Sequence, residues 1–214
     1  MRRHKFFDFT KEEMQVFERL NTPQKIQQFL DKLPINFEEN GETYLSPREM
    51  LRHKTAHCSE AAIFAAVVLW YHDQKPLILD LKTWKDQDHV VTLFKQNGYW
   101  GAISKTNHAA LRYRDPIYKT VRELVLSFFH EYFKDNGTKT LRSYSLPYDL
   151  SKIKNRDWLT SKEHLWGIIY NLDHSKHFSL LNKTQIRNLR KADAVEIAAG
   201  KIVEWKKGKH KKNV

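Results

Sequence analysis

The sequence contains a single cysteine, Cys58, among 214 residues. One cysteine excludes an intramolecular disulfide and suits a reducing compartment. No apolar stretch reaches the roughly 20 residues that a membrane-spanning helix needs, because the longest is broken at Tyr71-His72-Asp73. The first residues, Met1 to Asp8, are basic but lack the apolar segment of a signal peptide. We therefore expect a soluble cytoplasmic protein with no membrane partner.

Acidic residues are too few to balance the basic ones: 25 Asp and Glu stand against 37 Lys and Arg, which gives a net charge of +12. Such an excess attracts phosphates and acidic surfaces. We expect the tail at 207–214 to be a solvated charged end, and it is a candidate for weak contact with nucleic acid or an acidic partner. Much of the excess lies near this end, where only Glu204 opposes Lys201, Lys206, Lys207, Lys209, Lys211 and Lys212.

Helix signals dominate the part of the chain before Cys58. Apolar residues recur at helical spacing from Phe9 to Leu20. Thr22-Pro23 and Ser46-Pro47 each combine a capping side chain with a proline suited to the first helical position. We expect helices to begin at both pairs.

Strand signals follow from Pro76 onward. Pro76 to Leu81 is a short apolar run, which predicts a central strand. Asp88 to Phe94 and Tyr99 to Ser104 flank Asn97-Gly98, the strongest short-range signal for a hairpin. Thr140 to Leu146 predicts a last strand.

The remaining segments read as helices. One is expected over Val121 to Phe133, one opening at Asp157, Thr160 or Ser161, and one over Lys183 to Trp205. This order predicts an α+β fold rather than alternating βαβ units. We divide the chain into a core with N-terminal helices (1–150), a C-terminal helical extension (151–206) and the basic tail (207–214).

Cys58 precedes the most apolar run of the chain, which predicts a core helix from Cys58 to Tyr71. The cysteine would then occupy the first helical turn, where unpaired backbone N–H groups and the positive end of the helix dipole favour a thiolate. The alternative is that Cys58 is a small buried hydrophobe, the commonest role of a free cysteine.

The expected hairpin places a histidine beside a hydroxyl. A two-residue turn at Asn97-Gly98 pairs residues whose numbers sum to 195, so that Ser104 is a diagonal neighbour of His89 on one face. If Cys58 packs against this sheet, the three side chains form a nucleophile, a base and a group that orients the base.

These features resemble the transglutaminase-like superfamily, a branch of the papain-like fold, over about Leu45 to Ile117. The resemblance implies that Cys58 attacks an amide or ester carbonyl and that His89 is the base. It also implies a nucleophile-bearing helix packed on an antiparallel sheet, with additional helices. The matching residues are Cys58 with Glu60, Ala61 and Ala62, then Asp88-His89-Val90-Val91, then Asn97-Gly98-Tyr99-Trp100.

The third position departs from the family pattern. The resemblance implies an aspartate on the next strand, but Ser104 stands there. Asn107 is the nearest amide, and papain-like enzymes can use asparagine in this role. Asp115 lies farther on, Asp86 adjoins the strand, and adjacency to His89 points Asp88 to the opposite face. We take Cys58, His89, Ser104 and Asn107 as the candidate catalytic residues.

Two other groupings compete with this interpretation. Five residues could bind zinc, which accepts histidine and cysteine, but the expected helix start leaves two of them in a loop, so we expect neither metal nor cofactor. Arg112 and Arg114 fit either a bound carboxylate or phosphate or a loop salt bridge. The potential zinc ligands are His53, His57, Cys58, His89 and His108.

The sequence therefore yields two functional hypotheses. The first is a thiol-dependent hydrolase or acyltransferase that acts on a peptide or amide through a thioester on Cys58. The second is a non-catalytic module that keeps this fold and uses its basic surface to bind nucleic acid or an acidic partner.

Overall fold

The structure, a computed structural model, describes residues 8–208. Over these residues the fold is α+β, as expected, with an antiparallel sheet of seven strands. The order is β4-β3-β2-β1-β5-β7, and β6 pairs with β1. The strands are β1 (Leu77–Thr83), β2 (His89–Gln96), β3 (Tyr99–Ile103), β4 (Arg114–Tyr118), β5 (Leu141–Ser145), β6 (Tyr148–Asp149) and β7 (His177–Ser179).

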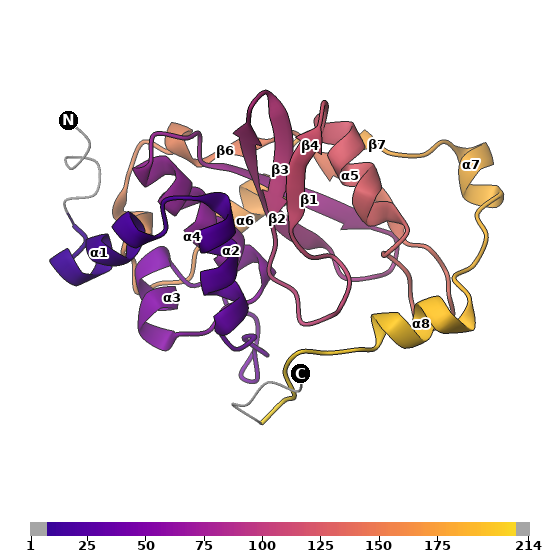
Figure 1. The fold of residues 1–214 in the computed structure, drawn as a ribbon, viewed down its shortest axis with the longest axis horizontal. Helices are drawn as coiled ribbons and strands as arrows, with labels where there is room; N and C mark the ends of the chain where they lie inside the picture. The colour runs from indigo at the N-terminus through magenta and orange to yellow at the C-terminus, as the bar shows by residue number, and fades with distance from the viewer. Residues whose placement is uncertain (1–7, 209–214) are drawn as a thin grey trace.

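Helices lie on both sides of this sheet (Figure 1), with α1–α4 on one side and α5 on the other. No helix within residues 8–208 combines the length and apolar character needed to cross a membrane. The helices are α1 (Lys11–Arg19), α2 (Pro23–Lys32), α3 (Pro47–His53), α4 (Cys58–Tyr71), α5 (Val121–Phe129), α6 (Trp166–Asp173), α7 (Lys183–Arg187) and α8 (Ala194–Gly200).

The N-terminal helices begin where the capping residues predict. The hydroxyl of Thr22 accepts a hydrogen bond from Lys25 N at 3.2 Å, and that of Ser46 accepts one from Glu49 N at 3.2 Å. Each bond satisfies a backbone donor that has no partner within its own helix. The expected helix starts at both Thr-Pro and Ser-Pro pairs are confirmed.

The Cys58 helix, α4, has the predicted bounds, Cys58–Tyr71. All residues from Ser59 to Trp70 are buried. A helix surrounded by protein on every side has no polar face, which is why this segment reads as an unbroken apolar run. Thr92 on β2 donates a hydrogen bond to the carbonyl of Ala62 at 2.7 Å and so fixes α4 against the sheet.

The predicted hairpin is confirmed in its register. Thr92 pairs with Ile103 and Gln96 with Tyr99, which leaves Asn97-Gly98 as a two-residue turn. Both turn residues have positive φ, 51° and 86°, as this type of hairpin turn requires.

Alternate residues of β2 face different cores. Val90 and Phe94 pack with α4, whereas Val91 and Leu93 pack with α5. The sheet is therefore buried on both faces over this strand, and its side-chain alternation decides which core each residue enters.

Helix α5 is shorter than expected, because it ends at Phe129 rather than Phe133. The chain turns away at His130, and Tyr132 then donates from its hydroxyl to Gln87 O at 3.0 Å. The carbonyl of Tyr132 accepts from Thr140 N at 2.9 Å. These contacts hold the segment in a turn toward β5. The apolar spacing therefore extends to Tyr132, although the helix has already ended.

The prediction of one long helix over Lys183–Trp205 is wrong. Two short helices, α7 and α8, replace it, each opened by a reciprocal capping box. In α7 the pair is Asn182 with Gln185, and in α8 it is Asp193 with Glu196. These pairs match the sequence signature of a helix start, and each one marks a new helix rather than a continuation.

The segment after Ser151 also adds to the sheet. Strand β7 pairs antiparallel with β5. The helix expected to open at Asp157, Thr160 or Ser161 begins instead at Trp166, and residues Asp157–Leu159 form a 3₁₀ turn. The sheet therefore continues into what the sequence indicated as a helical extension.

The last described residues bind a loop between β3 and β4. Ala109 N donates to Ile202 O at 3.0 Å, and Glu204 N donates to Asn107 O at 2.8 Å. Trp205 is buried. Lys206 and Lys207 are exposed, and residues 209–214 of the predicted basic tail lie outside the described part of the chain.

Candidate active site

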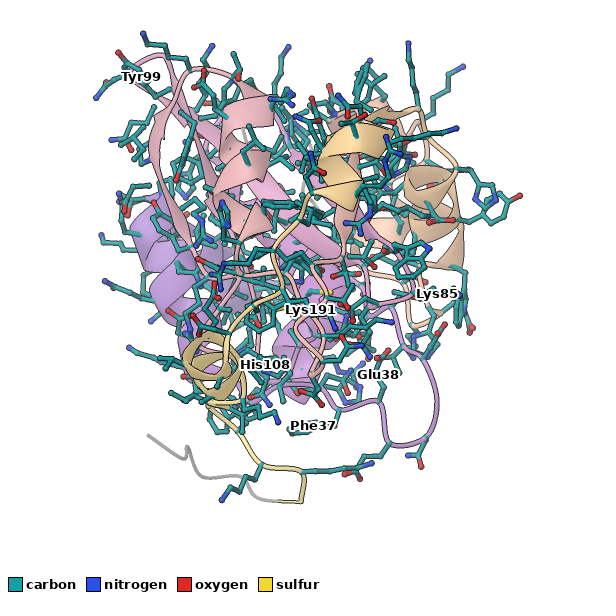
Figure 2. All side chains as sticks on the ribbon, turned by 90° about the vertical axis from the view of Figure 1, so that its right-hand side faces the viewer. Phe37, Glu38, Lys85, Tyr99, His108 and Lys191 are labelled. Atoms are coloured by element: carbon teal, nitrogen blue, oxygen red, sulfur yellow. The ribbon has the colours of Figure 1, made fainter. Side chains whose placement is uncertain are left out.

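Cys58 opens onto a cleft of about 970 Å³, which His57 and His89 also line. In Figure 2 the cleft residues Glu38 and His108 lie toward one end of the molecule and Tyr99, beside the hairpin turn, toward the other. The site therefore lies at the end of the sheet distant from the hairpin turn, where β2 begins.

Cys58 is half-buried at the edge of this cleft. Burial by itself would raise the pKa of the thiol, but hydrogen bonds and charge from His57 and His89 hold that pKa well below its ordinary value. The first-turn position in α4 acts in the same direction, because the helix dipole favours a negative charge there. The surroundings of Cys58 therefore favour the thiolate.

The His89 imidazole is buried and has a fixed tautomer. Its Nε2 lies 2.8 Å from Ser104 Oγ, and Ser104 Oγ donates to the carbonyl of Leu111 at 2.5 Å. Since the hydroxyl proton of Ser104 is used on that carbonyl, Ser104 Oγ must accept from Nε2–H. Nδ1 is then the unprotonated nitrogen, and it is the atom left to act on the thiol of Cys58.

Helix α4 packs across one face of β2, and Cys58 and His89 lie at the end of this contact, where both elements begin. His89 alternates with Val91 on the α5 side of β2, while α4 covers the other side. His89 and Cys58 are the first residues of β2 and α4. Because both residues stand at the ends of their elements, the His89 imidazole can reach the Cys58 thiol although it belongs to the side of the sheet that α5 covers.

Gln27 on α2 fixes the backbone of Ser104. Its Oε1 accepts from Ser104 N at 3.0 Å, and its Nε2 donates to Ser104 O at 2.8 Å. Gln27 is 7% exposed, so these bonds form away from water. The sequence analysis missed this residue, since the contact joins positions 77 apart in the chain.

The acceptor carbonyl of Leu111 is held in a strained backbone. Leu111 has φ of 60°, in the left-handed region that side chains disfavour. Its N–H donates to Glu131 Oε2 at 2.6 Å, and that carboxylate pairs with Arg114 at 2.6 Å. Such strain persists only where the surrounding contacts impose it. Here it directs the carbonyl at Ser104.

The buried carboxylate of Glu60 accepts hydrogen bonds from several segments around the cleft. Its Oε1 accepts from Thr43 Oγ1 at 2.8 Å and from Leu45 N at 3.1 Å. Its Oε2 accepts from His57 N at 3.0 Å and from Asn36 Nδ2 at 3.2 Å. One side chain of α4 therefore anchors the loop at 36–45 beside the cysteine.

The predicted role of Asn107 beside His89 needs correction. Its Oδ1 accepts from Trp205 N at 2.8 Å, and its Nδ2 donates to Trp205 O at 3.0 Å. The carboxamide is thus engaged with the C-terminal segment, because a paired amide matches a peptide group on both edges. Of the two proposed third residues, Ser104 contacts the histidine.

The nearby aspartates serve other contacts. Asp88 Oδ1 accepts from Thr83 N at 2.7 Å, and Asp86 Oδ2 accepts from Thr140 Oγ1 at 2.7 Å. Asp115 is exposed on β4, an edge strand that tolerates the neighbouring proline.

The five potential zinc ligands do not gather in one place. His53 lies 3.6 Å from Glu49 on α3, and His108 Nδ1 lies 2.9 Å from Gly200 O. Within residues 8–208 the one close group of potential metal-binding side chains is Asp80, Asp88 and Asp173. Lys82 forms ion pairs with the last two of these carboxylates. The arginine pair forms salt bridges with Glu204 and Glu131.

Carboxylates outnumber lysines in the cleft lining despite the basic net charge. Two lysines line it, Lys105 and Lys201. The electrostatic potential in the cleft therefore repels phosphates, which a surface of net charge +12 would attract. The eight acidic lining residues are Glu38, Glu42, Asp80, Asp86, Asp88, Glu131, Asp135 and Asp173.

Comparisons with known proteins assign no family. No protein-family model matches the chain, and no curated protein matches it. The functional interpretation therefore rests on the geometry of the chain's own residues.

Proposed function

We propose that this protein is a thiol-dependent acyl-transfer enzyme with a papain- and transglutaminase-like core, acting on a peptide or amide through a thioester on Cys58. The observation that carries the proposal is the chain of contacts from His89 through Ser104 to the carbonyl of Leu111. It gives the histidine the tautomer that a base toward the thiol requires.

In the first step His89 Nδ1 takes the proton of the Cys58 thiol. The thiolate attacks the substrate carbonyl carbon, a C–S bond forms, and negative charge develops on the carbonyl oxygen. The backbone N–H of Cys58 lies in the first turn of α4 and has no acceptor within the helix, so it is suited to stabilise that oxygen. The C–N bond then breaks, and His89 returns the proton to the leaving amine.

In the second step a water molecule or an amine attacks the thioester. His89 Nδ1 takes a proton from this acceptor, the C–S bond breaks, and Cys58 leaves as a thiolate that recovers the proton from His89. Hydrolysis and transfer thus share the same residues and differ in the acceptor.

Ser104 orients His89 but brings no charge to it. A carboxylate at this place would also stabilise the imidazolium. The hydroxyl of Ser104 therefore holds the His89 ring in the correct orientation and leaves stabilisation of the imidazolium charge to other groups.

The charge of the cleft favours peptide substrates over nucleic acid. Lys82 and Arg114 already pair with three of its eight carboxylates, and the remaining acidic excess attracts cationic side chains or an amine acceptor. A reactive thiol also needs a reducing environment, and for this reason we retain the cytoplasm as the proposed location. The chemistry requires neither metal nor cofactor.

The test uses p-nitrophenyl acetate, an activated ester, as a generic acyl donor. We expect rapid release of one equivalent of nitrophenol, faster than with free cysteine, and an acetyl group on the peptide that contains Cys58. The variants Cys58→Ser and His89→Asn should lose this burst while remaining folded. Acylation no faster than that of free cysteine, or unchanged in His89→Asn, would support the non-catalytic binding module instead.

A further inference from the structure

His57, the residue before the nucleophile, places a second imidazole at the thiol. Its side chain is 12% exposed. Its Nε2 lies 2.6 Å from the carbonyl of Thr43, so this nitrogen carries a proton and donates it. Nδ1 is then the ring atom that faces the first turn of α4.

Carboxylates surround the Nε2 side of this ring. Glu60 Oε1 lies 3.5 Å from Nε2 and Glu38 Oε1 lies 3.6 Å from it. Tyr44 packs its ring edge-on at 5.6 Å between centroids. Two acidic side chains at this distance favour the positively charged imidazole in a site shielded from water.

Nδ1 has two alternative partners in the first turn. In the neutral ring it accepts from Ser59 N at 3.2 Å and thereby caps α4. Once protonated, the same nitrogen becomes a donor, and the neighbouring thiol of Cys58 is the acceptor whose hydrogen bond favours this charged form. Burial would lower the pKa of His57, but its contacts with Cys58 and Glu60 outweigh this and raise the pKa to about 9.

We propose that His57 is a catalytic residue that supplies the positive charge stabilising the Cys58 thiolate, while His89 supplies the base. The inference rests on the proposed function and adds to it. It assigns to His57 the electrostatic role that an uncharged Ser104 cannot fill. The charged groups that face His57 are Cys58 and Glu60 on α4 and Glu38 in the loop at 36–45.

The test is the pH dependence of iodoacetamide alkylation of Cys58 in the full chain. The main variant is His57→Asn, because asparagine is also a favoured helix cap and cannot carry the positive charge of the imidazolium. We expect its thiol pKa to rise by at least one unit, which makes alkylation roughly tenfold slower at a pH below both thiol pKa values. The matched control is His53→Asn, an exposed histidine beside Glu49 that should change nothing.

Two further variants separate this inference from the proposed function. In His89→Asn the thiol pKa should stay below that of free cysteine, because His57 still acts on the sulfur. In Cys58→Ser the NMR titration of His57 should move to lower pH, because the thiolate is gone. Circular dichroism checks that each variant is folded, and His57→Ser is a second variant with a capping side chain.

The outcomes are distinguishable. A low thiol pKa in the wild type that is unchanged in folded His57→Asn would overturn the role of His57 and leave the Cys58–His89 mechanism intact. An ordinary thiol pKa in the wild type would overturn both. A low pKa that is lost completely in His89→Asn would assign the whole effect to His89 and also overturn the inference.

Discussion

The Gln27→Leu substitution tests how the site is held in place. Leucine fills similar space on α2 but cannot bond to Ser104. The backbone N–H and C=O of Ser104 would both lose their partners in a buried setting. The matched control is Gln28→Leu, the same change one residue along the helix at an exposed position.

The expected loss of stability follows from the two bonds. A buried polar group without a partner costs about 1–3 kcal/mol. Partial access of water to the loosened backbone reduces the sum, so we expect about 2–4 kcal/mol for the pair. For a chain of this length each kcal/mol lowers the melting temperature by about 2–4 °C, which predicts a fall of about 4–16 °C.

The substitution should also affect chemistry. Ser104 Oγ would no longer be held 2.8 Å from His89 Nε2, and alkylation of Cys58 should slow at a temperature where the variant is still folded. In a double-mutant cycle the effects of Gln27→Leu and Ser104→Ala on alkylation should be less than additive, because both act through the same bond. A melting temperature equal to that of Gln28→Leu would refute the energetic reasoning. A destabilised variant with unchanged alkylation would refute the link to His89.

Other substitutions test separate parts of the structure. Ser104→Ala should slow Cys58 alkylation and Ser104→Thr, which keeps the hydroxyl, should restore it; equal rates in the two variants would contradict the relay to His89. Burial raises the pKa of Asp80 to about 6 despite the opposing contact with its histidine partner on β7. Its stabilising contribution is therefore complete below about pH 3.9 and lost as pH rises through about 6. Asp80→Asn should flatten the fall in melting temperature over that range, whereas an unchanged slope would contradict the shift. Truncation after Lys206 should leave the melting temperature unchanged, and a fall of several degrees would show that the tail packs. Trp205→Ala should cost about 3–5 kcal/mol in urea unfolding, typical of a buried aromatic, and a cost near zero would show that its burial contributes no stability.

Local signals were sufficient for the elements that form the centre of the site. The bounds of α4 follow from an apolar run with Cys58 at its start, and the hairpin register follows from Asn97-Gly98. Both depend on neighbours in the chain and on side-chain alternation, which a sequence displays directly. The contact between His89 and Ser104 was predictable for this reason.

The contacts that hold the site in place were not predictable in the same way. Gln27 meets Ser104 across 77 positions, and Leu111 adopts a left-handed backbone without glycine or asparagine to indicate it. Each depends on which segments the fold brings together. The hydrogen bonds between the Asn107 carboxamide and the Trp205 backbone also could not be predicted, since the C-terminal segment reaches Asn107 only in the folded chain.

The prediction of one long C-terminal helix failed for a different reason. The sequence carried the evidence against one long helix, because Asp193 and Glu196 form a capping box in the middle of the expected span. A helix-start signal inside an expected helix indicates that one helix ends there and a new one begins.

The central claim is that Cys58 is an activated thiol paired with His89. The most direct measurement is the rate of iodoacetamide alkylation of Cys58 against pH, in the wild type and in His89→Ala. We predict that the wild-type thiol titrates well below the value of about 8.5 for free cysteine and that His89→Ala moves the titration upward. A thiol that titrates near the free value in both proteins, or that reacts only after unfolding, would contradict the account.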